Sequence, residues 1–445
     1  MPRRPVRGGP DGAFPQSLEH DPAAALLQNG GMTSGLQMAE LIEEARRRIV
    51  DHVYLSPCAR SEYFSRLCGL EAYFKLENLQ MTGSFKERGA LNRILTLSDD
   101  ECRRGLITAS AGNHGQAVAY HAGRLGLKAT VVMPLPTPLI KVANTRSFGA
   151  DVRLAGETFD DAQAHAHELE AEVGATYVHP FDDVQVIAGQ GTIGFELMAQ
   201  EPDLEVIVVP VGGGGLISGI AAAYKAHRPQ TRIVGVQTQA VPSMRESLAA
   251  GGPVAVDRRH TIADGIAVKR PADLTLKLVE ELVDDLVTVD EEEIANAVLL
   301  LLEREKAVVE GAGAAVLAAV VNDHVPQAKG RRTAMVLTGG NIDVTLLSRI
   351  IERGLTKDGR LVQLDVCVKD RPGALGALLN LVGDAGANVI ETHHERAFTA
   401  LGLNEVHIEL RLETRGPEHV EELIAAIAAA GLHVRRQTEP QSWHD

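Results

Sequence analysis

The sequence predicts an α/β protein with a mostly parallel sheet covered by helices on both faces, followed by a smaller unit of βαββαβ order. Two patterns lead to this prediction. Short apolar runs alternate with helical stretches up to about residue 352, and alternating apolar and polar residues begin after residue 360. The chain of 445 residues is long enough for about two or three domains with a large core.

The ordered part is predicted to begin near residue 35 with an amphipathic helix. Apolar residues recur at helical spacing among charged neighbours between Met38 and Val50. Residues 1–31 are rich in Pro, Gly and Arg and lack the apolar core of a signal peptide, so we expect a disordered tail. Met32 is therefore a candidate natural start.

Seven short apolar or β-branched runs follow, separated by helical stretches. They are Ala72–Lys75, Leu106–Ala109, Ala129–Met133, Val152–Leu154, Glu205–Val211, Arg232–Gln237 and Thr333–Thr338. Strands that alternate with helices are joined by crossover connections, which favours a parallel sheet. Ligands of such folds bind at the carboxyl ends of the strands.

The C-terminal part is predicted to be a separate domain. Polar residues 353–360 are expected to link a main domain of residues 35–352 to a C-terminal domain of residues 361–440. Beyond this linker the pattern predicts a strand at 362–368, a helix at 374–385, strands at 389–392 and 406–412, a helix at 417–430 and a strand at 432–435. This order is the ferredoxin-like plan.

Composition excludes several classes of function. A net charge of -15 argues against general affinity for nucleic acid or for an acidic membrane, since both need a basic surface. No apolar run reaches the roughly 18 residues that span a bilayer. The four cysteines form no pair or cluster of zinc spacing, so we expect a reduced, cytoplasmic setting.

One lysine lies in a short Gly-bounded segment, Thr82–Ala90, after a predicted strand. Lys86 follows the aromatic Phe85 and could form a Schiff base with an aldehyde cofactor. Lys-Glu-Arg is equally typical of the first turn of a solvated helix, so this segment alone leaves both interpretations open. Three later segments favour the first, because each suits a phosphorylated aromatic cofactor: Ser110–Gly115, Gly212–Leu216 and Thr338–Asn341.

Four successive glycines, Gly212, Gly213, Gly214 and Gly215, follow an apolar strand and precede a helix that starts near Leu216. Without Cβ atoms the backbone can approach a ligand closely, and the first N–H groups of the helix point to the same place. No lysine follows as in a nucleotide-binding loop, so a monophosphate fits better than a nucleoside triphosphate. The alternative is a flexible turn.

Ser110–Gly115 opens a helix directly after a strand. Its backbone amides and the Ser110 hydroxyl could hold a carboxylate, and Asn113 could donate to a phenolic oxygen. Alternatively Ser110 caps the helix. For His114 we expect a structural role.

Two further segments contain residues typical of ligand sites. Thr338 ends an apolar strand before two glycines, which would expose its hydroxyl in a cleft, although such a residue is more often a simple turn residue. Gly189–Gly194 fits the GxGxxG pattern, but the strand expected before it and the acidic residue expected after it are missing. We therefore expect no dinucleotide there.

Taken together, these segments make the chain resemble the fold-type II pyridoxal-phosphate enzymes, and among them the threonine ammonia-lyases (threonine dehydratases). The resemblance runs from about residue 35 to the C-terminus. It also covers His179–Asp183, Ala188–Gly194 and Ala263–Val268. It implies a two-lobed catalytic domain like that of the tryptophan synthase β chain, with pyridoxal 5'-phosphate as cofactor.

The resemblance also implies roles for the site residues. Lys86 would carry the cofactor as a Schiff base and then move the substrate proton. The cofactor would be held by Phe85 beside the ring, Asn113 at the phenolic oxygen, Gly212, Gly213, Gly214, Gly215 and Leu216 at the phosphate, and Thr338, where the family usually has Ser, at the pyridine nitrogen. The substrate carboxylate would be bound by Ser110, Ala111 and Gly112, next to Asn113.

The implied reaction is the conversion of L-threonine into 2-oxobutanoate and ammonia, in isoleucine biosynthesis or threonine catabolism. L-serine ammonia-lyase differs by one substrate methyl group, and sequence does not separate the two. An inactive amino-acid sensor is a third reading, against which the intact Lys86 argues. A cysteine-synthase or cystathionine-forming role fits the lysine segment less well.

Three positions separate the chain from the serine racemases it also resembles. Those enzymes carry a second serine, used as a base, where this chain has Ala111. They have metal-ligating acidic residues where this chain has Gln237 and, by its apparent alignment, Ser243. Because Mg²⁺ and Ca²⁺ prefer carboxylates, we expect no metal at that site.

The C-terminal unit, with Asp370–Leu375 at its first turn, looks like an ACT domain. In such enzymes this domain commonly binds an amino-acid effector at a subunit interface, and the turn supplies backbone amides for a carboxylate. A purely structural dimerisation unit is the alternative. The resemblance also implies a homotetramer or a homodimer.

Overall fold

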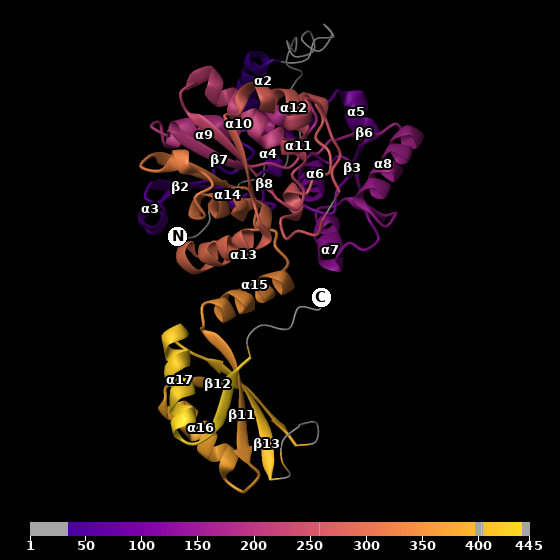
Figure 1. The fold of residues 1–445 in the computed structure, drawn as a ribbon. Coiled ribbons are helices and arrows are strands. Elements are labelled where there is room, and N and C mark those ends of the chain that lie inside the picture. The colour runs from indigo at the N-terminus through magenta and orange to yellow at the C-terminus, as the bar shows by residue number, and fades with distance from the viewer. Residues whose placement is uncertain (1–33, 258, 397–401, 403, 438–445) are drawn as a thin grey trace.

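The computed structural model describes residues 34–257, 259–396, 402 and 404–437. Figure 1 shows an upper body with two sheets surrounded by helices, from which α15 (Val344–Lys357) leads to a smaller C-terminal unit. The expected tail, residues 1–31, the candidate start Met32 and the last residues of the expected C-terminal domain, 438–440, lie outside the described residues.

The larger sheet has six strands in the order β1-β2-β10-β7-β8-β9. Their bounds are β1 (Cys58–Ser61), β2 (Glu71–Leu76), β10 (Arg332–Leu337), β7 (Val206–Pro210), β8 (Arg232–Thr238) and β9 (Asp285–Val289). Every pairing is parallel except that of β1 with β2. The prediction of a mostly parallel sheet is confirmed.

The smaller sheet has four parallel strands in the order β5-β4-β3-β6. They are β5 (Asp151–Leu154), β4 (Ala129–Met133), β3 (Leu106–Ala109) and β6 (Thr176–Tyr177). The strands of the upper body therefore form two separate sheets, which agrees with the two lobes that the family resemblance implies.

Helices surround both sheets of the upper body (Figure 1). Their bounds are α2 (Gly35–Ile49), α3 (Glu62–Cys68), α4 (Lys86–Leu95), α5 (Asp99–Arg104), α6 (Asn113–Arg124), α7 (Leu139–Ser147), α8 (Phe159–Val173), α9 (Val184–Gln200), α10 (Gly215–His227), α11 (Ser243–Ala250), α12 (Asp273–Leu282), α13 (Glu291–Leu300) and α14 (Gly311–Val321). None of the helices in the described part of the chain is long and apolar enough to cross a membrane.

The first helix, α2, begins three residues before the predicted Met38. The hydroxyl of Ser34 accepts a hydrogen bond from the backbone of Gln37, and the Gln37 side chain accepts one from the backbone of Ser34. This capping box satisfies two N–H groups that a helix start leaves unpaired, so it fixes the helix start at Gly35.

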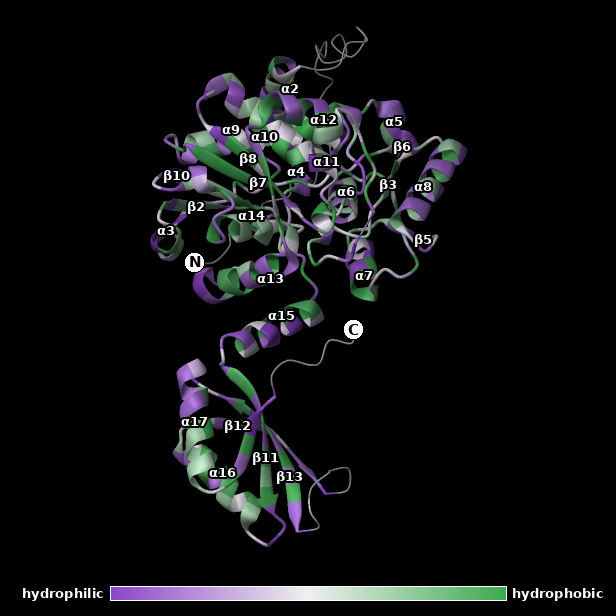
Figure 2. Cartoon of the chain, viewed as in Figure 1, coloured by the Kyte–Doolittle hydropathy of each residue, from purple (hydrophilic) through white to green (hydrophobic). Residues whose placement is uncertain are grey.

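Buried aliphatic residues of the central strands form the core of the upper body. All five residues of β7 are buried, and so is every residue of β8 except Arg232. Figure 2 shows these two strands in hydrophobic colours, whereas α8 carries much hydrophilic colour. Strands β1 and β9 are edge strands and only partly buried, so the apolar pattern did not reveal them. The two-residue β6 was missed because it is so short.

The GxGxxG segment lies inside the buried helix α9 and not in a loop. A Cβ atom at Gly189 would lie 2.5 Å from the carbonyl oxygen of Arg88 in α4, and one at Gly191 would lie 2.9 Å from that of Gly219 in α10. These glycines therefore let three helices pack closely.

We expect Gly189→Ala to destabilise the fold by about 1–3 kcal/mol, because the added methyl group meets backbone that cannot easily move. Gly376→Ala is the matched control, since Gly376 lies inside a helix with no atom within 4 Å of the added Cβ, and alanine favours helix there by about 1 kcal/mol. Urea unfolding of both variants measures the effect. Equal stability of the two variants would contradict this account.

The C-terminal unit is a four-stranded antiparallel sheet in the order β12-β13-β11-β14, packed against two helices. Its elements are β11 (Leu361–Lys369), α16 (Ala374–Asp384), β12 (Asn388–Glu395), β13 (Glu405–Glu413), α17 (Pro417–Ala429) and β14 (His433–Arg436). The predicted βαββαβ order is confirmed, with a core of its own between sheet and helices.

The segment expected as a linker, residues 353–360, is largely helical. Helix α15 continues to Lys357, so only Asp358–Arg360 remain as a turn before β11. The polar residues that suggested a linker lie on a helix that is mostly exposed and buries only Ile350 fully.

Candidate active site

A cavity of about 1210 Å³ lies where the two sheets of the upper body meet. Every site residue expected from the sequence lines it, from both lobes: Phe85, Lys86, Ser110, Ala111, Gly112, Asn113, Gly212, Gly213, Gly214, Gly215, Leu216 and Thr338. These segments follow β3, β7 and β10 or precede α4, so the cavity lies at the carboxyl ends of the parallel strands, as predicted.

Lys86 is the first residue of α4, and its side chain points into this cavity. Its Nζ donates to the carbonyl oxygen of Pro180 at 2.8 Å and lies 5.1 Å from the centre of the Phe85 ring. Burial lowers the pKa of Lys86 to about 8, although the Glu310 carboxylate opposes this shift. A useful fraction of neutral amine is therefore present near neutral pH.

Backbone pairing joins the lysine segment to the end of β10. The amide of Phe85 donates to the carbonyl oxygen of Thr338 at 3.0 Å, and that of Gly340 donates to the carbonyl oxygen of Gly83 at 2.9 Å. An isolated bridge between Ser84 and Gly339 lies between them. Two segments about 250 residues apart are thus fixed together, which brings Lys86 and Thr338 to one wall.

The glycine segment forms a concave turn at the start of α10. Gly214 has φ of +92°, a conformation that disfavours other residues. A Cβ atom at Gly213 would lie 2.4 Å from the ring of Phe181, so this position admits only glycine without rearrangement. The observed shape of the turn therefore requires glycine at these two positions.

The serine segment follows β3 and leads into α6. The amide of Gly112 donates to Ser110 Oγ at 3.2 Å, and Gly112 itself is the N-cap residue, without a side-chain cap. The alternative in which Ser110 caps the helix is therefore wrong. The backbone of Ala111 and Gly112 faces the cavity at the amino end of α6, where an anion is favoured.

His114 has the structural role that we expected. Its Nε2 lies 2.9 Å from the carbonyl oxygen of Val178, and burial, with the charge of Lys86 nearby, lowers the pKa of His114 to about 3. The ring is therefore neutral at ordinary pH and ties α6 to the segment after β6.

The turn at residues 179–182 supports Lys86 in a way that sequence reasoning did not identify. His179 Nδ1 accepts from the backbone N–H groups of Phe181 at 3.3 Å and Asp182 at 2.7 Å. This turn orients the Pro180 carbonyl toward Lys86 and places the Phe181 ring against Gly213. The family resemblance includes the segment His179–Asp183, but it assigns no role to these residues.

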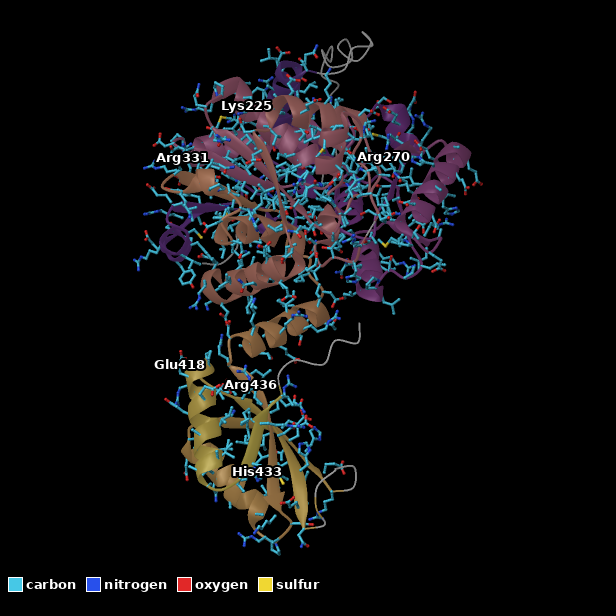
Figure 3. All side chains as sticks on the ribbon, in the orientation of Figure 1. Lys225, Arg270, Arg331, Glu418, His433 and Arg436 are labelled. Atoms are coloured by element: carbon cyan, nitrogen blue, oxygen red, sulfur yellow. The ribbon has the colours of Figure 1, made fainter. Side chains whose placement is uncertain are left out.

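Ion pairs cross between the lobes at the cavity. Lys141 of α7 lies 3.1 Å from Asp264, and Lys269 lies 2.6 Å from Asp160 of α8. Arg270, labelled in Figure 3, also lines the cavity. The cavity is thus lined by charged side chains, which suits a small polar substrate.

The positions compared with the metal ligands of serine racemases are used within the protein. Gln237 Oε1 accepts from the backbone of Arg245 at 2.9 Å, and the Ser243 hydroxyl donates to the carbonyl oxygen of Val268. Within the described residues no group of three or more His, Cys, Asp or Glu side chains could hold a metal ion.

The cavity fits pyridoxal phosphate by its donor set. It combines one buried lysine of lowered pKa, a glycine turn at a helix amino end and a buried threonine hydroxyl, from Lys86, Gly212–Gly215 and Thr338. An aldehyde, a phosphate and a ring nitrogen are the groups that these residues can bind. Cβ atoms at Gly213 and Gly215 would collide with Phe181, which also lines the cavity, so the shape of the turn requires glycine there.

Comparison with known proteins agrees with this geometry. A family model described as "Pyridoxal-phosphate dependent enzyme" matches residues 49–339. The L-threonine ammonia-lyase of Thermotoga maritima is 50% identical over 396 residues, which cover 89% of this chain and 98% of that protein. The L-threonine ammonia-lyase of Geobacter sulfurreducens is 48% identical over 394 residues, 88% of this chain and 98% of that protein.

Solved structures give the same result. Processed threonine deaminase isoform 2 from Solanum lycopersicum superposes with a TM-score of 0.69 at 38% identity, over 72% of this chain and 94% of that one. Maize serine racemase gives a TM-score of 0.68 at 34% identity, over 72% of this chain and 98% of that one. The chain therefore belongs to the pyridoxal-phosphate dependent enzymes of fold-type II, with pyridoxal 5'-phosphate as its cofactor.

Proposed function

We propose that this enzyme is an L-threonine ammonia-lyase, which converts L-threonine into 2-oxobutanoate and ammonia. The main observation that supports this proposal is the cavity in which the Lys86 amine, the glycine turn and the Ser110–Asn113 segment meet. Relatives of 50% and 48% identity that bear this name, aligned over nearly their whole length, support the choice of substrate.

Each part of the cavity has a proposed task. Lys86 holds the cofactor aldehyde, and Phe85 lies beside the ring. Gly212, Gly213, Gly214, Gly215 and Leu216 hold the phosphate, Asn113 donates to the phenolic oxygen and Thr338 binds the pyridine nitrogen. The backbone of Ser110, Ala111 and Gly112 binds the substrate carboxylate.

The bound cofactor withdraws electrons from the substrate, so that a proton can leave Cα. Lys86, freed when the substrate amine takes its place, would be the base for this proton, because burial lowers the pKa of its amine to about 8 and so increases the neutral fraction. The glycine turn would hold the cofactor phosphate, which would supply the proton with which the Cβ hydroxyl departs as water. The released enamine reacts with water to give 2-oxobutanoate and ammonia.

Elimination is favoured over racemisation by the residue opposite Lys86. Ala111 offers only a methyl group, where the resemblance places the second base of serine racemases. A proton cannot be returned to the other face of Cα by this side chain. The fold is shared with maize serine racemase, so the distinction depends on this side chain and not on the architecture.

Two domains are proposed, a catalytic one of residues 35–352 and an ACT-type regulatory one of residues 361–440. The C-terminal βαββαβ unit, with its own core and a turn that begins α16 after Gly373, supports an amino-acid effector there. A homotetramer or homodimer in the cytoplasm, acting in isoleucine biosynthesis or threonine catabolism, completes the proposal.

A keto-acid assay on threonine and serine tests the proposed substrate. We expect kcat/KM for threonine to exceed that for serine by about 10- to 200-fold, the discrimination that one methyl group allows. A larger value for serine would make the enzyme an L-serine ammonia-lyase.

The same assay with added isoleucine or valine tests regulation. It is repeated on a variant truncated after Lys357. An effect of the amino acid that survives truncation would contradict an effector site in the C-terminal domain.

A further inference from the structure

Glu310 is a buried carboxylate in the cofactor cavity that none of the roles above uses. It directly precedes α14 and lines the cavity together with Asn113 and Thr338. Its Oε1 accepts a hydrogen bond from Asn113 Nδ2 at 2.8 Å. Burial, assisted by the Asp264 carboxylate, raises the pKa of Glu310 to about 7.

Asn341 contacts the same amide from the other side. Its Nδ2 donates to Asn113 Oδ1 at 2.7 Å and to the carbonyl oxygen of Thr82 at 2.8 Å. These two acceptors use both hydrogens of the Asn341 amide and so fix its orientation. The first of these hydrogen bonds also occupies the carbonyl oxygen of Asn113.

With Glu310 ionised, the network favours one orientation of the Asn113 amide. If this amide were reversed, its carbonyl oxygen would face the Glu310 carboxylate and its NH₂ group would face that of Asn341. Both contacts would be repulsive. In the observed orientation, one N–H of Asn113 is bound by Glu310 and the second is available to a ligand.

Backbone geometry shows that the contact with Glu310 is built into the fold. A Cβ atom at Gly339 would lie 2.4 Å from Glu310 Oε1 and 3.1 Å from Asn113 Nδ2. The amide of Glu310 also donates to the carbonyl oxygen of Gly339 at 2.9 Å. The loop after β10 therefore needs glycine at this position for the carboxylate to reach Asn113.

We propose that Glu310 and Asn341 are positioning residues that hold the Asn113 amide so that its second N–H donates to the phenolic oxygen of the cofactor. The inference rests on the role proposed for Asn113 but not on which amino acid is the substrate. Because a donor at this oxygen changes the electron distribution of the chromophore, the absorbance spectrum reports on it directly.

The test measures the absorbance spectrum of the holoenzyme and the dissociation constant of pyridoxal phosphate, with Asn113→Ala as the reference. We expect Glu310→Ala and Asn341→Ala to weaken cofactor binding about tenfold and to shift the spectrum in the direction of the reference. Glu310→Gln keeps an acceptor for Asn113 and is expected to retain the wild-type values. Asn78→Ala, which removes a partly buried amide that donates to the carbonyl oxygen of Val308, is the matched control and should change neither.

Combination with the reference variant separates positioning from an independent effect. The double variant Glu310→Ala/Asn113→Ala should behave like Asn113→Ala alone, since Glu310 has nothing left to position. Additive effects, or a Glu310→Gln shift as large as that of Glu310→Ala, would overturn the inference, and thermal melting identifies variants that merely fail to fold. An unchanged spectrum in Asn113→Ala would also refute the role proposed for Asn113, whereas keto-acid formation from threonine tests the proposed function separately.

Discussion

Lys86→Ala is expected to lower the turnover of threonine by at least about 100- to 10,000-fold, the usual contribution of one positioned acid–base group. The variant loses both the amine that holds the cofactor and the base that removes the substrate proton. No other described lysine donates to the Pro180 carbonyl oxygen, so no neighbour occupies the same place. Initial rates of keto-acid formation measure the loss.

Two further measurements make this expectation specific. The absorbance band of the Schiff base with Lys86 should be lost from Lys86→Ala, and any pyridoxal phosphate that remains in the cavity should show the spectrum of the free aldehyde. Lys225→Ala is the control, because Lys225 lies on the surface of the upper body, where it is paired with Asp284 at 2.7 Å (Figure 3). Should Lys86→Ala retain wild-type turnover, the mechanism above is wrong.

The pH dependence of Lys86 follows from its surroundings. Because its pKa is about 8, the Lys86 amine is neutral in about half of the enzyme molecules at pH 8, whereas an ordinary lysine is neutral in about 0.3% of them. Burial favours the neutral form, so a substitution that admits water should raise this pKa and increase the pH needed for proton removal.

The sequence was sufficient for those parts of the site that consist of contiguous motifs. The Gly212–Gly215 turn and Thr338 lie at strand ends that the apolar pattern reveals, Lys86 begins a helix after another such strand, and a parallel sheet gathers strand ends at one edge. The C-terminal βαββαβ order was also readable, because apolar and polar residues alternate along β13 and along most of β11.

For other residues of the site, the sequence did not indicate a role. Glu310 precedes a helix, where an acidic residue looks like an ordinary cap, and its importance comes from Asn113, which is 197 residues away. The turn of His179 and Pro180 likewise acquires its role only when folding brings it to Lys86. Such partners depend on tertiary contacts, which periodicity does not encode.

The helix that carries Lys86 is anchored by a buried ionic network. Arg88 is fully buried and donates to Glu77 at two distances of 2.8 Å and to Glu196 at 2.6 and 2.8 Å. Lys75 donates to the same Glu196 at 2.6 Å. Although burial alone would raise the pKa of Glu77, Arg88, followed by Lys75 and Ser56, holds it below its ordinary value.

Arg88→Met is therefore expected to destabilise the enzyme by about 3–5 kcal/mol, because it leaves the Glu77 carboxylate buried with no guanidinium to offset its charge. Arg88→Lys keeps the positive charge but loses the paired hydrogen bonds, so its stability should lie between that of the wild type and that of Arg88→Met. Arg103→Met is the matched control, since Arg103 is exposed on α5 and its pair with Asp100 contributes less than about 1 kcal/mol. Urea unfolding at neutral pH gives the three values.

Acid should reduce the difference between Arg88→Met and the wild type. In the wild type the folded pKa of Glu77 is lowered, so its stabilising effect is present above the unfolded pKa and is lost as pH falls through the folded value. In Arg88→Met the main lowering influence is gone and burial raises this pKa, so protonation of Glu77 relieves the unpaired charge at mildly acidic pH. The difference in stability between the wild type and Arg88→Met should thus be largest near pH 7 and smaller near pH 5. A difference that does not change with pH would show that lost packing, and not the buried charge, is the cause.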